Sequence, residues 1–325
     1  MQRALVTGAG GFIGSHLAEH LVREGWAVRT LVRYNSHDQL GALAHADPGA
    51  RADMEIIAGD LRDADAVAAA VAGCDTVFHL GAMVSIPYSY RAPRDVVETN
   101  VMGTLNVLMA ARAHSTRRVV HTSTSEVYGT AQAAAIDEGH ILQGQSPYSA
   151  SKIGADKLAE AFNRSFDTPV VTLRPFNTYG PRQSPRAIIP TVIIQAQKGG
   201  ALRLGSLAPT RDFTYVTDTV AAFALAASAD VVGEVVHLGT GVSVSVGELV
   251  RLVGEVLGTE LRVVTDDQRI RPPESEVMRL SSDPKRARDL LGWEPRVTLD
   301  EGLRRTVHWL SQGGADWFRL PAYGV

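Results

Sequence analysis

The sequence predicts a mixed α/β fold, in which a doubly wound parallel sheet is followed by a smaller α/β domain toward the C-terminus. Short apolar runs typical of buried strands alternate with stretches of helical periodicity over residues 1–177, and a glycine-rich segment joins the first run to the first helix. Beyond residue 177 this alternation weakens. We therefore assign residues 1–177 to the first domain, to which some later segments return, and residues 178–325 mainly to the second.

Composition excludes several classes of protein. The chain has 325 residues, 45% of them hydrophobic and 21% charged, which is ordinary for a globular protein. Its formal net charge of -3 provides no basic surface for nucleic acid or an anionic membrane. No apolar run reaches the roughly 18 residues of a membrane span, and an expected strand almost at Met1 leaves no room for a signal peptide. We expect a cytoplasmic protein.

The single cysteine, Cys74, excludes an intrachain disulfide. It stands before an expected strand, which favours a small buried residue. No Cys/His cluster has metal-ligand spacing, so no metal site is expected.

The first strand, residues 3–7, leads into a glycine loop. Gly8, Gly11 and Gly14 form a G-x-x-G-x-x-G pattern, and residues 15–22 have helical periodicity. Glycines allow a tight turn and a close approach of the backbone to a pyrophosphate, whose charge the helix N-terminus favours. A flexible loop is the alternative, but the position between a strand and an amphipathic helix favours dinucleotide binding in a Rossmann-like domain.

The end of the second strand, residues 27–32, bears on the choice of cofactor. Sites that bind NAD usually place an acidic residue here, on the ribose 2′-hydroxyl. Arg33, Asn35 and Ser36 stand here instead, with no acid among residues 32–36. Arg33 and Ser36 can hold a 2′-phosphate, which slightly favours NADP over NAD unless Arg33 is only a solvated loop residue.

Further strands are expected at residues 54–58, 76–82 and 117–122, with a helical stretch at residues 96–114, and this order predicts a parallel sheet. Asp60 follows the third strand and is either a ligand for the adenine amino group or a turn residue. The fourth strand ends in Gly81 and Ala82, which can lie under the cofactor. His79, in the same apolar strand, is expected to be structural.

Polar side chains follow the fifth strand at Thr124, Ser125 and Glu126. Ligands bind at the carboxyl ends of parallel strands, so these groups would face the nicotinamide. A polar strand end is the alternative. This alternative is disfavoured because Tyr148 and Lys152 follow downstream.

Tyr148 and Lys152 are four residues apart on a helix expected to run to about Phe166. This spacing places both side chains on one face. A lysine ammonium one turn away favours the phenolate and lowers the tyrosine pKa. Such a tyrosine can take a proton from a sugar hydroxyl while a hydride leaves the same carbon.

The C-terminal part contains candidate phosphate ligands. A sixth strand is expected at residues 170–174, whereas residues 174–183, with two prolines and a glycine, are expected to be irregular. Residues 244–257 have helical periodicity. Arg211 and Arg271 are candidates to clamp a diphosphate, although each alone can equally be a surface arginine.

Four motifs in one order resemble the extended short-chain dehydrogenase/reductase superfamily, specifically its nucleotide-sugar epimerases and dehydratases. They are Thr7-Gly8-x-x-Gly11-x-x-Gly14, the Thr124/Glu126 strand end, Tyr148-x-x-x-Lys152 and Arg174-Pro175-x-Asn177-x-Tyr179-Gly180-Pro181. The resemblance covers nearly the whole chain. It implies a retained NAD or NADP, a nucleoside diphosphate sugar as substrate and a homodimer packed through two helices per subunit.

The resemblance also implies residue roles. The residues expected at the cofactor are Gly8, Gly11, Phe12, Ile13, Gly14, Arg33, Asn35, Ser36, Asp60, Leu61, Leu80, Gly81, Ala82, Asn100, Thr122, Tyr148, Lys152 and Pro175. Those expected at the substrate are Ser85, Thr124, Glu126, Asn177, Ile189, Val192, Arg211 and Arg271. The catalytic set is Thr124, Ser125, Glu126, Tyr148 and Lys152.

Within the superfamily, the Thr124-Ser125-Glu126 run resembles that of GDP-mannose 4,6-dehydratase and of UDP-glucuronate decarboxylase. Residues 122–129, 143–152 and 174–182 together are most similar to 4,6-dehydratases of UDP- or GDP-linked N-acetylglucosamine, of the legionaminic acid type. A 4-epimerase needs no carboxylate where Glu126 stands, whereas removing a proton beside a C4 ketone does. The dTDP-glucose dehydratases have Asp where this chain has Ser125, so the acid at C6 stays open. A 4-epimerase, a UDP-glucuronate decarboxylase and, remotely, a non-enzymatic dinucleotide sensor are the alternatives.

Overall fold

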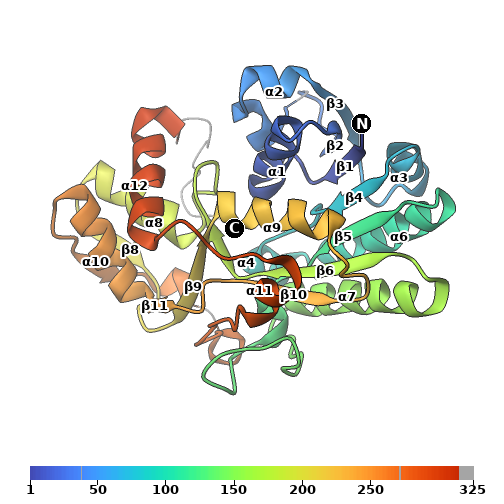
Figure 1. Ribbon diagram of the computed structural model, residues 1–325. Coiled ribbons are helices and arrows are strands. Elements are labelled where there is room, and N and C mark those ends of the chain that lie inside the picture. Colours follow the sequence, from blue (N-terminus) through green and yellow to red (C-terminus); the bar gives the residue numbers. More distant parts are fainter. Residues whose placement is uncertain (38, 271, 315–325) are drawn as a thin grey trace.

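The computed structural model describes residues 1–37, 39–270 and 272–314. Its centre is a seven-stranded parallel sheet in the order β10-β6-β5-β4-β1-β2-β3 (Figure 1). The strands are β1 (Arg3–Thr7), β2 (Ala27–Arg33), β3 (Met54–Gly59), β4 (Thr76–His79), β5 (Arg118–Thr122), β6 (Val170–Pro175) and β10 (Val235–Leu238). The predicted parallel, doubly wound sheet is confirmed.

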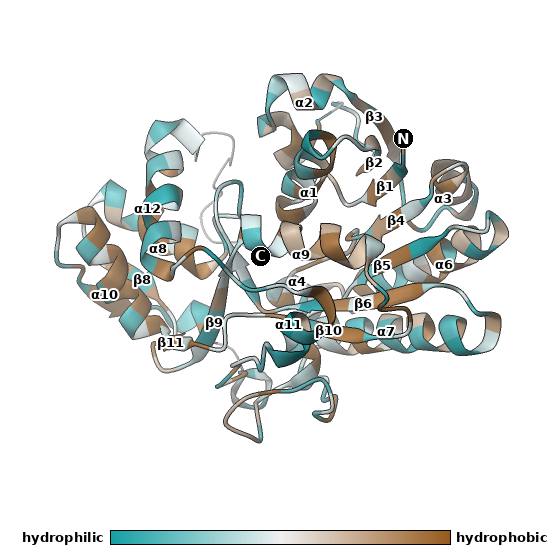
Figure 2. Ribbon diagram, viewed as in Figure 1, coloured by the Kyte–Doolittle hydropathy of each residue, from teal (hydrophilic) through white to brown (hydrophobic). Residues whose placement is uncertain are grey.

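Helices cover both faces of this sheet, because neighbouring residues of each buried strand point to opposite sides. Val6 lies in one core cluster with Leu17 and Phe223, whereas its neighbour Leu5 lies in another with Val67. The helices on the first face include α1 (Phe12–Arg23) and α9 (Val216–Ser228), and those on the second are α3 (Ala64–Val71), α6 (Gly103–Ala113) and α7 (Pro147–Phe166). Figure 2 shows hydrophobic residues concentrated along the sheet between these layers.

The smaller part is built on two short sheets. One has the order β11-β9-β7, and β12 pairs with β8 in the other. The strands are β7 (Asn177–Tyr179), β8 (Leu202–Leu204), β9 (Thr210–Tyr215), β11 (Ser243–Ser245) and β12 (Val263–Thr265), with α8 (Ile188–Lys198), α10 (Val246–Leu257) and α12 (Leu299–Trp309) beside them. The chain returns to the main sheet through α9 and β10, and α11 (Lys285–Leu291) packs near β10.

Two expectations about local structure were wrong. Residues 174–183 include the end of β6 and all of β7, because Pro175 lies beyond the last β5 pairing, at Leu173, where its missing N–H is not needed. β4 ends at His79, since the Gly81 N–H donates to the Thr7 hydroxyl. The expected helical stretch at 96–114 is confirmed, with a π-helical turn, Glu98–Met102, between α5 (Pro93–Val97) and α6.

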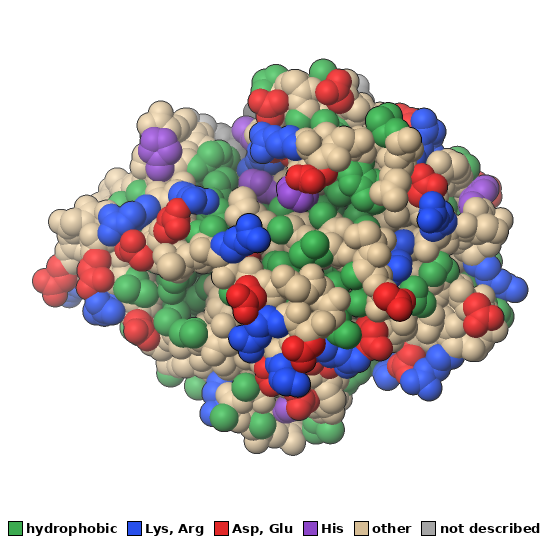
Figure 3. Space-filling view, viewed as in Figure 1, with side chains coloured by type: hydrophobic (Ala, Val, Ile, Leu, Met, Phe, Trp, Pro, Cys, Tyr) green, Lys and Arg blue, Asp and Glu red, His purple; other side chains and the backbone are tan. Residues whose placement is uncertain are grey.

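Charge is evenly distributed on the face shown in Figure 3, where acidic and basic side chains alternate. This agrees with the small net charge of -3. Over the described residues, no helix combines the length and apolarity that crossing a membrane requires.

Candidate active site

The helix α7 begins immediately before the predicted Tyr-Lys pair. Ser146 caps it in a reciprocal arrangement with Ser149, and Pro147 occupies its first turn, where no N–H donor is needed. This start buries Tyr148 and Lys152, which are 5% and 4% exposed. The predicted helix is therefore confirmed, and its first two turns face the protein interior.

Lys152 is directed at strand β5. Its Nζ atom donates to the carbonyl oxygen of Thr122 at 2.7 Å. Burial lowers the pKa of Lys152 to about 8, against a smaller opposing effect of the Asp156 carboxylate. The residue is therefore a cation that the fold partly destabilises and that loses its proton more readily than a lysine in water.

Tyr148 differs from expectation. Burial raises its pKa, with a further contribution from the negative charge of Glu126, and a hydrogen bond with Thr124 lowers it only in part. The predicted net lowering by Lys152 is wrong for the protein alone, because desolvation of the phenolate dominates and the ammonium binds the Thr122 carbonyl. Tyr148 is therefore a protonated phenol at neutral pH in the protein alone.

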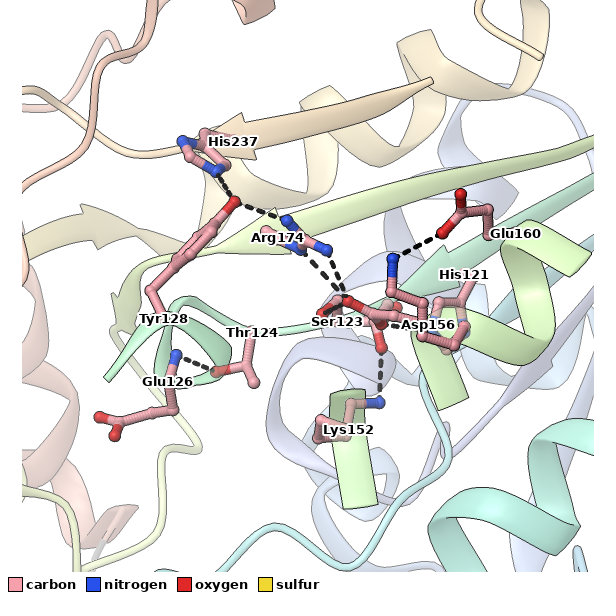
Figure 4. A network of polar contacts seen from close by, with 12 residues as sticks. His121, Ser123, Thr124, Glu126, Tyr128, Lys152, Asp156, Glu160, Arg174 and His237 are labelled. Atoms are coloured by element: carbon pink, nitrogen blue, oxygen red, sulfur yellow. Dashed lines mark hydrogen bonds and ion pairs between the residues drawn. The ribbon is translucent and has the colours of Figure 1, made fainter. Parts of the chain in front are cut away.

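The end of β5 is followed by three candidate catalytic side chains. Thr124 caps a short 3₁₀ helix, Ser125–Tyr128, and its Oγ1 accepts the Glu126 N–H at 3.2 Å (Figure 4). Ser125 is buried and Glu126 is half-buried. Thr124 hydrogen-bonds Tyr148, and the charge of Glu126 raises the Tyr148 pKa, so both residues act on the phenol.

The glycine loop forms a cradle that only glycine fits. Gly8 has φ +71°, and a Cβ there would lie 2.7 Å from the Gly81 Cα. A Cβ on Gly14 would lie 2.3 Å from the Gly8 carbonyl oxygen. Helix α1 starts after Gly11 with no side-chain cap, so its first N–H groups remain for an anion. These features fit the pyrophosphate of a dinucleotide, with Phe12 and Ile13 at the helix start.

Loops around the cradle contain the other expected cofactor residues. Asn35 organises the turn after β2, where its side chain bonds the backbone of Arg33, His37 and Gln39, while Arg33 and Ser36 are exposed. Asp60 pairs with Arg62 at 2.6 Å, and this hydrogen bond lowers the Asp60 pKa.

Leu61 limits the space beside Gly81, since a Cβ there would come within 2.6 Å of its Cδ1. Leu80 and Ala82 follow β4 on either side of Gly81, and Pro175 ends β6. The Thr122 Oγ1 is buried without a hydrogen-bond partner among the described residues, as expected of a group that binds a ligand.

Two buried polar residues, His79 and Asn100, hold neighbouring elements together through hydrogen bonds. His79 lies between the hydroxyls of Thr7 and Thr104, at 2.9 and 3.0 Å, and burial holds its pKa well below the usual value. Its predicted structural role is confirmed. Asn100 accepts the Met83 N–H and donates to Ser151 on α7, so it joins the π-helical turn to the catalytic helix.

Two of the residues expected at the substrate, Asn177 and Arg211, have polar side chains that can contact a ligand. The Asn177 Oδ1 is buried with no hydrogen-bond partner among the described residues, so it has capacity for a ligand. Arg211 is 7% exposed, donates to the Thr210 carbonyl and lies 3.6 Å from Glu276. This cation is thus held beside an anion within the protein.

Three of the other residues expected at the substrate have roles in the fold instead. Ile189 and Val192 are 1% and 0% exposed in the main core, so their side chains offer no surface to a nucleotide base. Ser85 caps the short helix α4 (Ile86–Arg91) through the Tyr88 N–H. Arg271 lies outside the described residues.

Sequence reasoning missed a buried polar cluster behind the catalytic pair. Asp156 lies one turn beyond Lys152 on α7 and pairs with Arg174 at 2.9 Å. The signal was available, because Tyr148, Lys152 and Asp156 recur at four-residue spacing on one helix face. Glu276 was also missed, and no local pattern marks it as a partner of Arg211.

Known proteins resemble this chain over nearly its whole length. A family model described as GDP-mannose 4,6 dehydratase matches residues 5–306. A dTDP-glucose 4,6-dehydratase of Actinoplanes sp. is 34% identical over 97% of this chain and 99% of its own. A UDP-glucose 4-epimerase of Mycolicibacterium smegmatis is also 34% identical, over 94% of this chain and 97% of its own.

Solved structures agree with these relatives. A dTDP-glucose 4,6-dehydratase from Streptomyces venezuelae with NAD bound has a TM-score of 0.86 at 32% identity, over 98% of this chain and 99% of its own. A UDP-glucuronic acid 4-epimerase from Bacillus cereus, in complex with UDP-glucuronic acid and NAD, has a TM-score of 0.87 at 26% identity, over 96% of this chain and 99% of its own.

The fold and the Tyr-Lys site define the class as an extended short-chain dehydrogenase/reductase with a Rossmann-like domain. The chain belongs to the GDP-mannose 4,6-dehydratase family, within the superfamily of nucleotide-sugar 4,6-dehydratases and epimerases. The structural neighbours contain NAD, and none of these similarities supports the preference for NADP inferred from Arg33.

Proposed function

We propose that this protein is an NAD-dependent nucleotide-sugar 4,6-dehydratase. The observation that supports this function over epimerisation is the Glu126 carboxylate, which lies near enough to Tyr148 to raise the phenol pKa. A base at that position is needed to remove a proton beside a C4 ketone, whereas inversion of the configuration at C4 requires no such base. The product would be a 4-keto-6-deoxy sugar.

The first half of the reaction uses Thr124, Tyr148 and Lys152. Oxidised NAD supplies the hydride acceptor and a positive charge in the site. Tyr148 takes the C4 hydroxyl proton and Thr124 hydrogen-bonds the C4 oxygen. Lys152, which donates to the Thr122 carbonyl in the protein alone, would favour the phenolate only on turning toward Tyr148 in the complex. Burial raises the pKa of Tyr148 in the protein alone, so the positive charge of the oxidised cofactor would favour proton removal.

The second half uses Glu126. The C4 ketone acidifies the C5 hydrogen, Glu126 takes that proton, and the C6 hydroxyl leaves as water. The hydride then returns to C6 and a proton from solvent adds at C5, while Tyr148 gives up the proton that it took from the C4 hydroxyl, so there is no net oxidation of the sugar. Ser125 is too weak an acid to protonate the leaving hydroxyl. Glu126 itself, or a water relay, would deliver that proton.

The substrate that we propose is a UDP- or GDP-linked N-acetylglucosamine. Asn177 and Arg211 would contact the diphosphate, and the unpartnered Asn177 Oδ1 supports a ligand at this place. Arg271 remains a predicted phosphate ligand. A homodimer packed through two helices per subunit and a cytoplasmic location remain predictions.

Epimerisation is the second candidate, because a UDP-glucose 4-epimerase is as similar in sequence as a dehydratase, at 34% identity. A uronate decarboxylase would need a cation for the sugar carboxylate, and no residue described here is assigned to that role.

The deciding experiment is product mass and configuration in deuterated water. The protein would be incubated with NAD and UDP-N-acetylglucosamine, and in parallel with GDP-N-acetylglucosamine and UDP-glucose. Loss of one water with deuterium at C5 is expected. Unchanged mass with an altered C4 configuration would instead establish an epimerase.

A further inference from the structure

A buried carboxylate next to the catalytic pair has a full set of donors. Asp156 is 4% exposed and accepts hydrogen bonds from His121 Nε2 at 3.0 Å and from Ser123 Oγ at 2.7 Å. Arg174 adds two more, from Nε at 3.2 Å and Nη2 at 2.9 Å (Figure 4). Asp156 therefore ties α7 to the ends of β5 and β6.

Electrostatics keep this group ionised. Burial by itself raises the pKa of Asp156, but the hydrogen bond from His121 and the charge of Arg174 outweigh it and lower the pKa to about 2. Burial works against the Arg174 cation, yet the Asp156 charge holds the Arg174 pKa above its usual value. A buried ion pair with its hydrogen bonds complete is geometrically rigid, and removal of one partner is costly.

Arg174 also contacts a buried tyrosine, Tyr128. Arg174 Nη1 donates to the Tyr128 hydroxyl at 2.6 Å, and the guanidinium lies 5.0 Å from the Tyr128 ring centroid. Burial lowers the pKa of His237 to about 3, so its ring is neutral and its Nε2 accepts the Tyr128 O–H at 2.5 Å. The Tyr128 hydroxyl is thus held from two sides in a site with no exposure.

Tyr128 is the last residue of the 3₁₀ helix that includes Glu126. That helix has weak hydrogen bonds of its own, since Val127 N to Thr124 O is 3.5 Å and Gly129 N to Glu126 O is 3.4 Å. A short 3₁₀ segment with long bonds needs external support to keep one conformation. Two contacts provide it: the Gln143 N–H donates to the Val127 carbonyl at 2.8 Å, and the buried hydroxyl of Tyr128 is held two residues from the Glu126 carboxylate.

We propose that Asp156, Arg174 and Tyr128 form a relay, a connected set of positioning residues. This relay holds Glu126 in a fixed position relative to Tyr148 and Lys152. The relay begins on the helix with the oxidation residues and ends on the segment with the elimination residue. Its role in elimination rests on the proposed function. Loss of the relay therefore affects proton removal at C5 more than oxidation at C4.

The test compares two Tyr→Phe variants of the full-length protein. Tyr128→Phe removes the relay hydroxyl and keeps the ring, whereas Tyr179→Phe removes a buried hydroxyl that donates to the Leu299 carbonyl at 3.3 Å. Amide hydrogen exchange of residues 124–129 without substrate is the first readout. Tyr128→Phe should exchange faster there, and Tyr179→Phe should match the wild type.

The second readout separates the two half-reactions on UDP-N-acetylglucosamine. Nicotinamide absorbance on mixing reports oxidation at C4, and deuterium incorporation reports proton removal at C5. The ratio of C5 exchange to C4 oxidation should fall roughly tenfold or more in Tyr128→Phe, since a displacement of about 1 Å can cost about a hundredfold in rate. Arg174→Lys, which keeps the charge but loses the planar fork, should behave likewise.

Equal ratios in Tyr128→Phe and Tyr179→Phe, with equal amide exchange, would overturn the relay and leave Tyr128 a packing residue. A wild-type protein that exchanges no C5 hydrogen with any of the three sugars would instead overturn the proposed function. In that case amide exchange in residues 124–129 still decides whether the relay holds the Glu126 segment.

Discussion

The Nζ atom of Lys152 lies 2.7 Å from the carbonyl oxygen of Thr122, so the catalytic helix is joined directly to the end of strand β5. Thr124 and Glu126 follow on the same strand end, and Tyr148 lies one turn before Lys152. One side-chain bond thus connects the residues of the oxidation with the segment that contains the proposed base of the elimination.

Stability should rise with pH because of Lys152. Its pKa is about 8 in the folded protein and ordinarily 10.5, so between these values the unfolded chain holds more protons and the free energy of unfolding increases. Lys152→Met lacks this titration. Urea unfolding of both proteins without added cofactor, at about pH 7 and about pH 10, should show wild type gaining on the order of 2–3 kcal/mol relative to the variant. An unchanged difference would mean that Lys152 is solvated.

Tyr148→Phe should abolish turnover, by about a thousandfold or more, because the C4 hydroxyl proton has no acceptor. NAD binding should stay within a few-fold of wild type, since the cradle of Gly8, Gly11 and Gly14 is untouched. Measurement of product formation checks the loss of turnover, and calorimetric titration with NAD checks the retained affinity. Substantial turnover by the variant would rule out Tyr148 as the base.

Glu126→Gln should suppress elimination, because an amide cannot take the C5 proton. Reduced nicotinamide should still form on mixing with substrate, since Tyr148 and Lys152 remain. The matched control is Glu160→Gln on the exposed side of α7, where Glu160 pairs with Lys157 and Arg164. Product mass in deuterated water is the measurement, and an active Glu126→Gln variant with an altered C4 configuration would favour an epimerase.

Gly14→Ala should weaken NAD binding by about tenfold or more, because the new Cβ would lie 2.3 Å from the Gly8 carbonyl oxygen and would distort the cradle. Gly247→Ala on α10 is the control, since its Cβ would meet nothing closer than 3.7 Å. Calorimetric NAD titration compares the two variants. Equal affinities would show that the loop accommodates a side chain and that its glycines are not required for the cofactor.

Local patterns predicted the elements that depend on neighbours in the chain. The glycine loop and the face shared by Tyr148 and Lys152 follow from backbone conformation and helical spacing, and the structure has them where expected. The parallel order of the sheet followed from the alternation of strands and helices.

Contacts between distant residues followed from tertiary packing alone. Asp156 meets Arg174 only because β6 lies beside β5, and Arg211 meets Glu276 across 65 positions of sequence. The protonation of Tyr148 was predicted in the wrong direction for the protein alone, because spacing reveals a neighbouring charge but not the desolvation that outweighs it. Helical spacing and backbone conformation therefore specified which groups share the site, whereas burial and long-range packing decided their charges, their partners and the support of Glu126.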